Sequence, residues 1–338
     1  MKIDAGVETN ALAAIPDVAR IAEDMGFDGL WTSEAGHNPY LPLAVAAVHS
    51  KRVELGTAIA VAFPRSPMVT AQIAWDLQAA SQGRFILGLG TQVKGHNEKR
   101  FSVKWESPGP KLKEQIQALR AIWDTFQNGT PLDYRGQFYQ FSLMTPFFSG
   151  GSIEHPRIPI YIAGVNEYMC RLAGELCDGF HVHPFHTTRY VNEFVKPLVA
   201  EGAARSGRDP RDVALTSSVF VIAGATADER ENMRALVRSQ LSFYASTRTY
   251  AKILEIHGWG EIGNRLSELS RTGGWADMPA LISDEMLSHC AVEGTWDEIP
   301  ELIRSKYTGV LDRVTLYWPF VPGRDDDRWR RLIDVIHR

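Results

Sequence analysis

Short apolar runs alternate with longer amphipathic stretches along almost the whole chain. Eight of these runs lack polar alternation, which is typical of parallel strands covered on both faces. They span residues 3–7, 29–33, 53–62, 85–89, 158–163, 179–183, 213–222 and 313–318. The third run is the clearest, because it closes at Phe63-Pro64 and Pro67 then stands where a helix can start.

Apolar positions at helical spacing fill most of the intervals between the strands. The pattern predicts helices over 15–25, 41–49, 67–81, 110–126, 167–176, 188–206, 227–246, 298–307 and 329–336. A polar loop is expected from Gly90 to Pro108. Two segments break the alternation: 129–158, with a short hairpin around Gly136, and an aromatic insertion over 247–279.

Eight strands, each joined to the next by a helix, favour a closed (β/α)8 TIM barrel over a doubly wound sheet. We therefore predict an α/β fold with one domain over residues 1–338 and insertions after strands four and seven. The sequence shows no short internal repeat, low-complexity tract or linker that would indicate a second domain.

Composition narrows the classes of function. The 338 residues are 44% hydrophobic and 22% charged, as in ordinary globular proteins, and the net charge of −4 argues against nucleic acid and anionic membranes as partners. The chain shows no signal peptide and no long apolar run. Its three cysteines lack metal-site spacing, so we expect reduced, buried thiols in a cytoplasmic protein.

In a (β/α)8 barrel, functional side chains lie where the strands end. Glu34 and His37 follow the second strand and offer a carboxylate and an imidazole for general acid–base work. A carboxylate that caps or salt-bridges the strand end is an equally simple interpretation of Glu34. Gly164 precedes a helix that begins near Asn166, where free N–H groups can cradle an anion, although glycine precedes many helices.

His181, His183 and His186 gather at the end of the sixth predicted strand, and together they suggest a metal site. His181 and His183 are two residues apart on the strand, so both can point into the barrel mouth. A metal site is the less favoured interpretation, because strands one, four and five end without an obvious ligand. We expect these imidazoles to contact a cofactor or substrate.

The chain resembles the luciferase-like monooxygenase superfamily, the TIM-barrel flavin and deazaflavin oxidoreductases, and is most similar to its F420-dependent branch. The resemblance runs from residue 3 to about residue 320. The segments that carry it are GFDGLW from Gly26, LGTAIAV from Leu55, SQGRFILGLG from Ser81, AGELCDG from Ala173 and GTWDE from Gly294. Coenzyme F420 is a 5-deazaflavin with a phosphate and a polyglutamate tail.

The resemblance implies roles for particular residues. It places a non-prolyl cis peptide at Ala58–Ile59, behind the cofactor ring, and Glu34 where many F420-dependent members have an aspartate. Residues implied to contact the cofactor are Ala58, Ile59, Ala60, Gly90, Thr91, Gln92, Gly164, Val165 and Asn166. Ala35 and Val93 depart from the sugar-phosphate dehydrogenase branch, which has His and Glu there. That branch's substrate is therefore not expected.

The resulting hypothesis is hydride transfer between F420 and a carbonyl or activated alkene. Glu34 or His37 would handle the proton, and His181 or His183 would contact cofactor or substrate. Trp259, Trp275 and the loop at Phe147-Phe148 would cover an apolar substrate. The alternatives are an FMN-dependent monooxygenase supplied by a flavin reductase, and a barrel that binds flavin without turnover.

The resemblance also implies a homodimer. The sequence suggests the second and third helices as the contact, because both carry many alanines: Ala44, Ala46, Ala47, Ala71 and Ala74.

Overall fold

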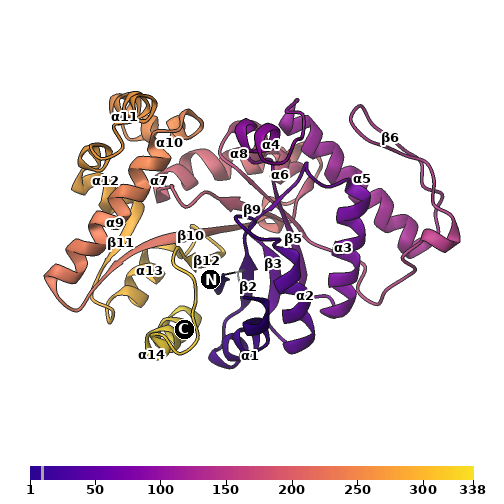
Figure 1. The fold of residues 1–338 in the computed structure, drawn as a ribbon, viewed down its shortest axis with the longest axis horizontal. Coiled ribbons are helices and arrows are strands. Elements are labelled where there is room, and N and C mark those ends of the chain that lie inside the picture. The colour runs from indigo at the N-terminus through magenta and orange to yellow at the C-terminus, as the bar shows by residue number, and fades with distance from the viewer. Residues whose placement is uncertain (9–10) are drawn as a thin grey trace.

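Eight parallel strands close into a barrel in the computed structural model, which describes residues 1–8 and 11–338 (Figure 1). The barrel strands, in order around the ring, are β1 (Lys2–Val7), β2 (Gly29–Thr32), β3 (Glu54–Thr57), β5 (Phe85–Gly90), β8 (Ile160–Gly164), β9 (Gly179–Val182), β10 (Ala214–Ala223) and β12 (Arg313–Leu316). Pairing of β1 with β12 closes the ring, so the two ends of the chain complete one barrel. The predicted (β/α)8 architecture is confirmed.

The helices that cover the barrel begin and end where local signals place them. They are α1 (Ile15–Met25), α2 (Tyr40–His49), α3 (Pro67–Ala80), α5 (Pro108–Asn128), α6 (Glu167–Leu176), α8 (Lys196–Arg205), α9 (Ala227–Ala245), α13 (Ile299–Tyr307) and α14 (Asp326–His337). The short α7 (Thr188–Tyr190) and a π-helical turn (Val191–Val195) lead into α8. Gly26 ends α1 with a φ of 98°, a left-handed conformation that glycine adopts without a side-chain clash.

An ion-pair network lies in the barrel interior near the amino-terminal ends of the strands. The Arg313 guanidinium donates to both carboxylate oxygens of Asp4, at 2.6 and 2.8 Å, and also pairs with Glu54. It lies 5.2 Å from the ring centre of Trp31. Arg313 and Asp4 are almost completely buried, so each charge depends on the other for solvation.

Three parts of the structure differ from the sequence prediction. The polar segment expected to be a loop contains a short helix, α4 (Lys94–Lys99). The insertion after the seventh barrel strand contains α10 (Ala251–Ile256) and α11 (Gly260–Thr272) and continues through α12 (Asp284–Cys290). A further strand, β11 (Ala291–Gly294), was not predicted and pairs with the outer half of β10.

The two insertions lie on opposite sides of the barrel in Figure 1. The first carries the predicted hairpin, β6 (Tyr134–Arg135) with β7 (Gln140–Phe141), and packs against α3 and α5 through Trp75, whose Nε1 donates to the Gly151 carbonyl at 3.0 Å. Phe147 is 88% exposed on this insertion and lines none of the cavities described below. Its expected role as a cover over substrate is therefore wrong, and the same holds for Phe148.

The remaining expectations concern membranes and thiols. In the part of the chain that the structure describes, no helix combines the length and apolar character needed to cross a membrane. Cys170, Cys177 and Cys290 are buried free thiols, and burial raises the pKa of each to about 12.

Candidate active site

The carboxyl ends of the barrel strands surround a cavity of about 650 Å³, which we call the central cavity. This volume falls within the range of small-molecule and cofactor sites. Of the eleven residues expected to contact a cofactor, ten line it: Ala58, Ile59, Gly90, Thr91, Gln92, Gly164, Val165, Asn166, His181 and His183. Ala60 does not, because its side chain is buried in β4 (Ala60–Val61), which pairs with β5 behind the cavity wall.

Small residues form one wall of the central cavity where β3 ends. The peptide bond between Ala58 and Ile59 is cis, as the resemblance implied. The Ala58 N–H donates to the Thr32 carbonyl at 2.7 Å, and the Ile59 carbonyl accepts from the Glu34 N–H at 3.2 Å. A Cβ on Gly90 would lie 2.7 Å from the Ile59 side chain, so a side chain at position 90 would displace this wall.

Glu34 is held in an ion pair instead of standing free at the cavity. Its two carboxylate oxygens accept from Arg65 at 2.6 and 2.9 Å, and one of them also accepts from the Val61 N–H at 2.7 Å. The Glu34 side chain is 6% exposed and does not line the central cavity. This arrangement matches the salt-bridge interpretation of Glu34 and fixes the turn after β4.

His37 lies in a second cavity of about 380 Å³ beside the first, which we call the side chamber. The side chamber and the central cavity share Trp31, Ala58, Ser218 and Thr315, so the two spaces adjoin at the ends of β2, β3, β10 and β12. The structure thus separates the two expected acid–base residues: His37 faces a cavity, whereas Glu34 is engaged by Arg65.

The amino-terminal end of α6 faces the central cavity. The Asn166 side chain caps this helix by accepting from the Met169 N–H at 3.0 Å, and Tyr190 donates to the Val165 carbonyl at 3.1 Å. The first N–H groups of a helix have no partners within it, and the helix dipole adds partial positive charge there. Lys94 also lines the cavity. Among the described residues that line the cavity there is no Asp or Glu. The site is therefore suited to an anionic group.

The two expected histidines both line the cavity as neutral imidazoles. Burial lowers the pKa of His181 and of His183 to about 3. The Phe185 N–H donates to Nδ1 of His183 at 3.1 Å, so the neutral ring carries its proton on Nε2 and can donate from there. The Tyr250 ring packs against this imidazole, with 4.4 Å between the two ring centres. Nε2 of His181 is buried without a well-formed hydrogen bond among the described residues, beside the Thr57 carbonyl.

The buried histidines predict loss of stability in mild acid. Between pH 6.5 and about 3, the unfolded chain binds a proton at His183 that the folded chain does not, so the free energy of unfolding falls as the pH falls. We expect this one site to cost about 1–2 kcal/mol between pH 7 and pH 5. Asp4 changes the free energy of unfolding in the opposite direction. Burial raises its pKa, so in acid the folded chain binds a proton at Asp4 before the unfolded chain does, which stabilises the fold as the pH falls.

A variant comparison isolates the histidine contribution. Urea unfolding of the wild type and of His183→Gln at pH 7 and pH 5 should show a smaller pH dependence in the variant. His49→Gln, on the exposed end of α2, is the matched control and should keep the wild-type dependence. Equal pH dependence in the wild type and H183Q would contradict the assignment.

Sequence reasoning missed residues that shape the cavity from outside the strand ends. Asn97 on α4 is buried and donates to the Thr91 and Val93 carbonyls at 2.9 and 3.1 Å, which holds the loop after β5. Lys94 begins the same helix, and Tyr250 comes from the second insertion. The GHNE run within the polar segment was the available signal for α4, but its short length hides it from periodicity.

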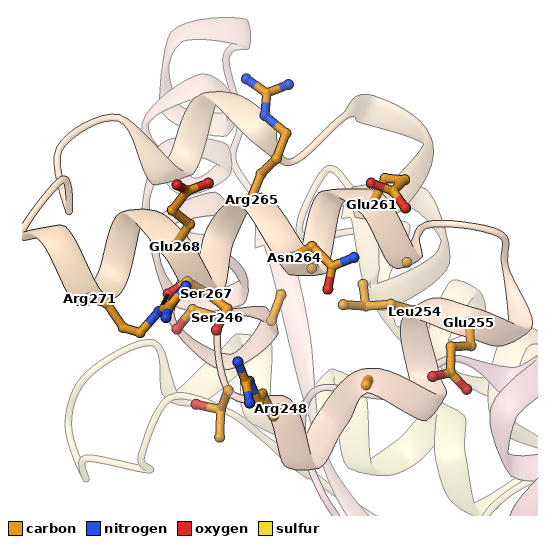
Figure 2. A pocket seen from close by; sticks show the side chains of 15 residues that line it. Ser246, Arg248, Leu254, Glu255, Glu261, Asn264, Arg265, Ser267, Glu268 and Arg271 are labelled. Carbon is orange, nitrogen blue, oxygen red and sulfur yellow. Dashed lines mark hydrogen bonds between the residues drawn. The ribbon is translucent and has the colours of Figure 1, made fainter.

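A separate polar cavity of about 520 Å³ lies within the second insertion, between the end of α9 and α11 (Figure 2). Its lining includes Arg248 and Arg271 together with Glu255 and Glu261, and it contains none of the expected site residues. Arg248 and Tyr250 belong to one short 3₁₀ turn between this cavity and the central one. In the described part of the chain, no group of three or more His, Cys, Asp or Glu side chains is arranged to hold a metal ion.

The closed barrel, with its cavities at the carboxyl ends of the strands, defines the class of this protein as a (β/α)8-barrel enzyme. The family model of the luciferase-like monooxygenases matches residues 1–313. The chain belongs to this family, which confirms the resemblance and the expectation of an enzyme.

Relatives of known sequence cover nearly the whole chain. An uncharacterised protein of Mycobacterium tuberculosis is 46% identical over 93% of this chain and 92% of its own length. A 5,10-methylenetetrahydromethanopterin reductase of Archaeoglobus fulgidus is 27% identical over 90% of this chain and 89% of its own length. A putative coenzyme F420-dependent oxidoreductase of M. tuberculosis is also 27% identical, covering 84% of each chain.

Solved structures share the fold at lower identity. The coenzyme F420-dependent tetrahydromethanopterin reductase of Methanopyrus kandleri superposes with a TM-score of 0.77 at 20% identity, covering 98% of this chain and 97% of that one. An F420-dependent secondary alcohol dehydrogenase has a TM-score of 0.74 at 17% identity, covering 99% and 98%. A riboflavin lyase with modified FMN has a TM-score of 0.75 at 12% identity, covering 100% and 91%.

Proposed function

We propose that this enzyme transfers a hydride between coenzyme F420 and a small organic substrate that carries a carbonyl or an activated alkene. The observation that carries the proposal is the central cavity, which combines a wall of small residues, a helix amino terminus and Lys94, with no Asp or Glu among the described residues that line it. Relatives named as F420-dependent support it at 27% sequence identity, and so do structural neighbours with F420-dependent activity.

The residues present fit this cofactor. Ala58, Ile59 and Gly90 form a narrow wall against which a flat ring system can lie. Val165 and Asn166, at the start of α6, would hold the phosphate through backbone N–H groups, and Lys94 adds a positive charge for the anionic tail. When bound, F420 supplies a hydride donor or acceptor at C5 of its deazaflavin ring. His183 has a donor available at Nε2 in the same space.

His37 is the residue that we assign to proton transfer, because it lies in the side chamber while Glu34 is committed to Arg65. Replacing His37 by Ala should lower kcat by about 10²-fold or more, the usual contribution of a general acid or base, and leave the Kd for F420 within about twofold. The measurement follows the absorbance of F420 during turnover with ketones and enones. His49→Ala is the control on α2, and an unchanged kcat in H37A would contradict the assignment.

FMN is the alternative cofactor, favoured by the structural similarity to an FMN-containing enzyme. The ring wall and the helix amino terminus suit both cofactors, because each joins a tricyclic ring to a phosphate through a ribityl chain. An FMN-dependent monooxygenase would need a partner reductase to supply reduced flavin. Oxygenation of an organic substrate in the presence of reduced FMN and O2, absent from a control without the enzyme, together with no turnover of F420, would support this alternative.

We also propose that the chain forms a homodimer, through a different face from the one that the alanines suggested. Ala46, Ala47, Ala71 and Ala74 are buried in the core of this chain and so are not available to a partner. The exposed large apolar side chains on α2 and α3 are Leu41, Val48 and Val69, and Ala44 is exposed on α2 as well. Burial of such a stripe favours association. Light scattering should give twice the chain mass at micromolar concentration, and Val48→Glu should give the monomer.

A further inference from the structure

A fourth cavity, of about 400 Å³, lies on the outer side of the barrel mouth and is lined mainly by apolar side chains. We call it the aromatic annex. Three tryptophans contribute to it, one from the segment after β11, one from the segment after β12 and one from α14. Its principal lining residues are Met233, Trp296, Ile299, Trp318, Trp329 and Leu332.

The annex adjoins the reaction site. Glu8, Leu316 and Pro319 line both the annex and the side chamber. The side chamber in turn shares Ala58 and Thr315 with the central cavity. The three cavities therefore form a row across the barrel mouth, from the proposed cofactor site through the chamber that contains His37 to the annex.

Packing keeps the annex walls in place. The ring of Trp329 packs against those of Phe27 and Phe320, with 5.5 and 5.7 Å between ring centres. The Arg328 guanidinium lies 4.6 Å from the ring centre of Trp296. β11 extends the sheet beyond the barrel and so positions the segment that carries Trp296. Charged side chains among the lining residues are few: Glu8, Arg324, Asp325 and Arg328.

One polar atom in this wall has no partner. The Nε1 atom of Trp318 is buried, and no hydrogen bond to it is found within residues 1–8 and 11–338. A buried indole N–H without an acceptor is costly. The annex offers mainly apolar surface, with Glu8, Arg324, Asp325 and Arg328 as the charged side chains of its described lining.

We propose that the annex binds the apolar body of the substrate, whose reacting carbonyl or alkene lies in the side chamber. This inference rests on the proposed function and adds a substrate class, namely hydrophobic ketones or enones with an extended or ring-bearing body. Substrates of acetone size would leave the annex empty. Burying apolar surface in the annex lowers the free energy of binding, so larger substrates with an apolar body should bind more tightly than small ones.

The first test follows tryptophan fluorescence, to which the three annex tryptophans contribute, and needs no cofactor. Purified protein is titrated with 2-butanone, 2-hexanone, 2-octanone and 2-decanone, and Kd is read from the midpoint of the change in tryptophan fluorescence. We expect affinity to rise about threefold to fourfold for each added methylene. Affinity that does not depend on chain length would overturn the proposal.

The second test fills the annex. Met233→Trp on α9 adds bulk to its lining, and Ser239→Trp adds the same indole to an exposed site on α9 that does not line it. M233W should weaken 2-decanone binding by at least about tenfold and change 2-butanone binding by less than about twofold. S239W should change neither. Equal 2-decanone affinity in M233W and the wild type, with matching melting temperatures, would overturn the proposal.

The two proposals can fail separately. If 2-decanone binding depends on chain length and is weakened in M233W, but F420 does not bind, the cofactor assignment is wrong and the annex assignment stands. If it binds F420 but shows no chain-length dependence for ketones, the annex assignment is wrong and the proposed function stands.

Discussion

Replacing Arg313 by Met should destabilise the protein by about 3–5 kcal/mol, the range expected when one partner of a buried ion pair is removed. Met preserves most of the apolar volume of the arginine stem. It leaves the completely buried Asp4 carboxylate without its two guanidinium hydrogen bonds and Glu54 without its inner partner. It also removes the cation packed against Trp31.

The free energy of unfolding in urea measures this effect. Arg304→Met, which removes an exposed pair with Glu301 on α13, is the control and should cost no more than about 0.5 kcal/mol. The double variant Asp4→Leu with Arg313→Met should recover much of the loss, because it removes the unpaired charge as well. A cost below about 1 kcal/mol for R313M alone would contradict the role assigned to the network.

Replacing Ala163 by Phe should abolish tight cofactor binding while the barrel stays folded. Ala163 lies on β8 opposite Gly90 on one side and His181 on the other, and all three line the central cavity. A phenyl ring there fills space that the proposed cofactor needs. We expect the Kd for F420 to rise by at least about 100-fold, equivalent to about 2.7 kcal/mol.

Calorimetry with F420 measures the change, and thermal unfolding checks the fold. Ala163→Ser adds one oxygen atom and should alter the Kd by less than about threefold. If A163F binds F420 as tightly as the wild type, the cofactor does not occupy the central cavity.

The barrel could be predicted because its strands have an unambiguous pattern. Fully apolar runs such as 85–89 are buried on both faces, and the helices between them have clear start and stop signals at Pro67 and Gly26. β11 escaped prediction because its four residues, of which only Ala291 and Val292 are buried, form no recognisable run. α4 escaped because six mostly polar residues cannot show helical periodicity.

The site could be predicted in outline because parallel strand ends converge at one mouth of the barrel. Residues at the ends of β3, β5, β8 and β9 therefore meet in the central cavity. The partner of Glu34 could not be predicted, since Arg65 is 31 residues away and its approach depends on the turn after β4. The sequence likewise could not show which ring nitrogen of His183 carries the proton. That depends on the Phe185 N–H, which donates to Nδ1 and so leaves the proton on Nε2.

The measurement that tests the central claim most directly is a calorimetric titration of the purified protein with oxidised F420 and, separately, with FMN. The proposed function predicts tight binding of F420 and binding of FMN that is weaker by at least about tenfold, or 1.4 kcal/mol. A preference for FMN, or no binding of F420, would contradict it.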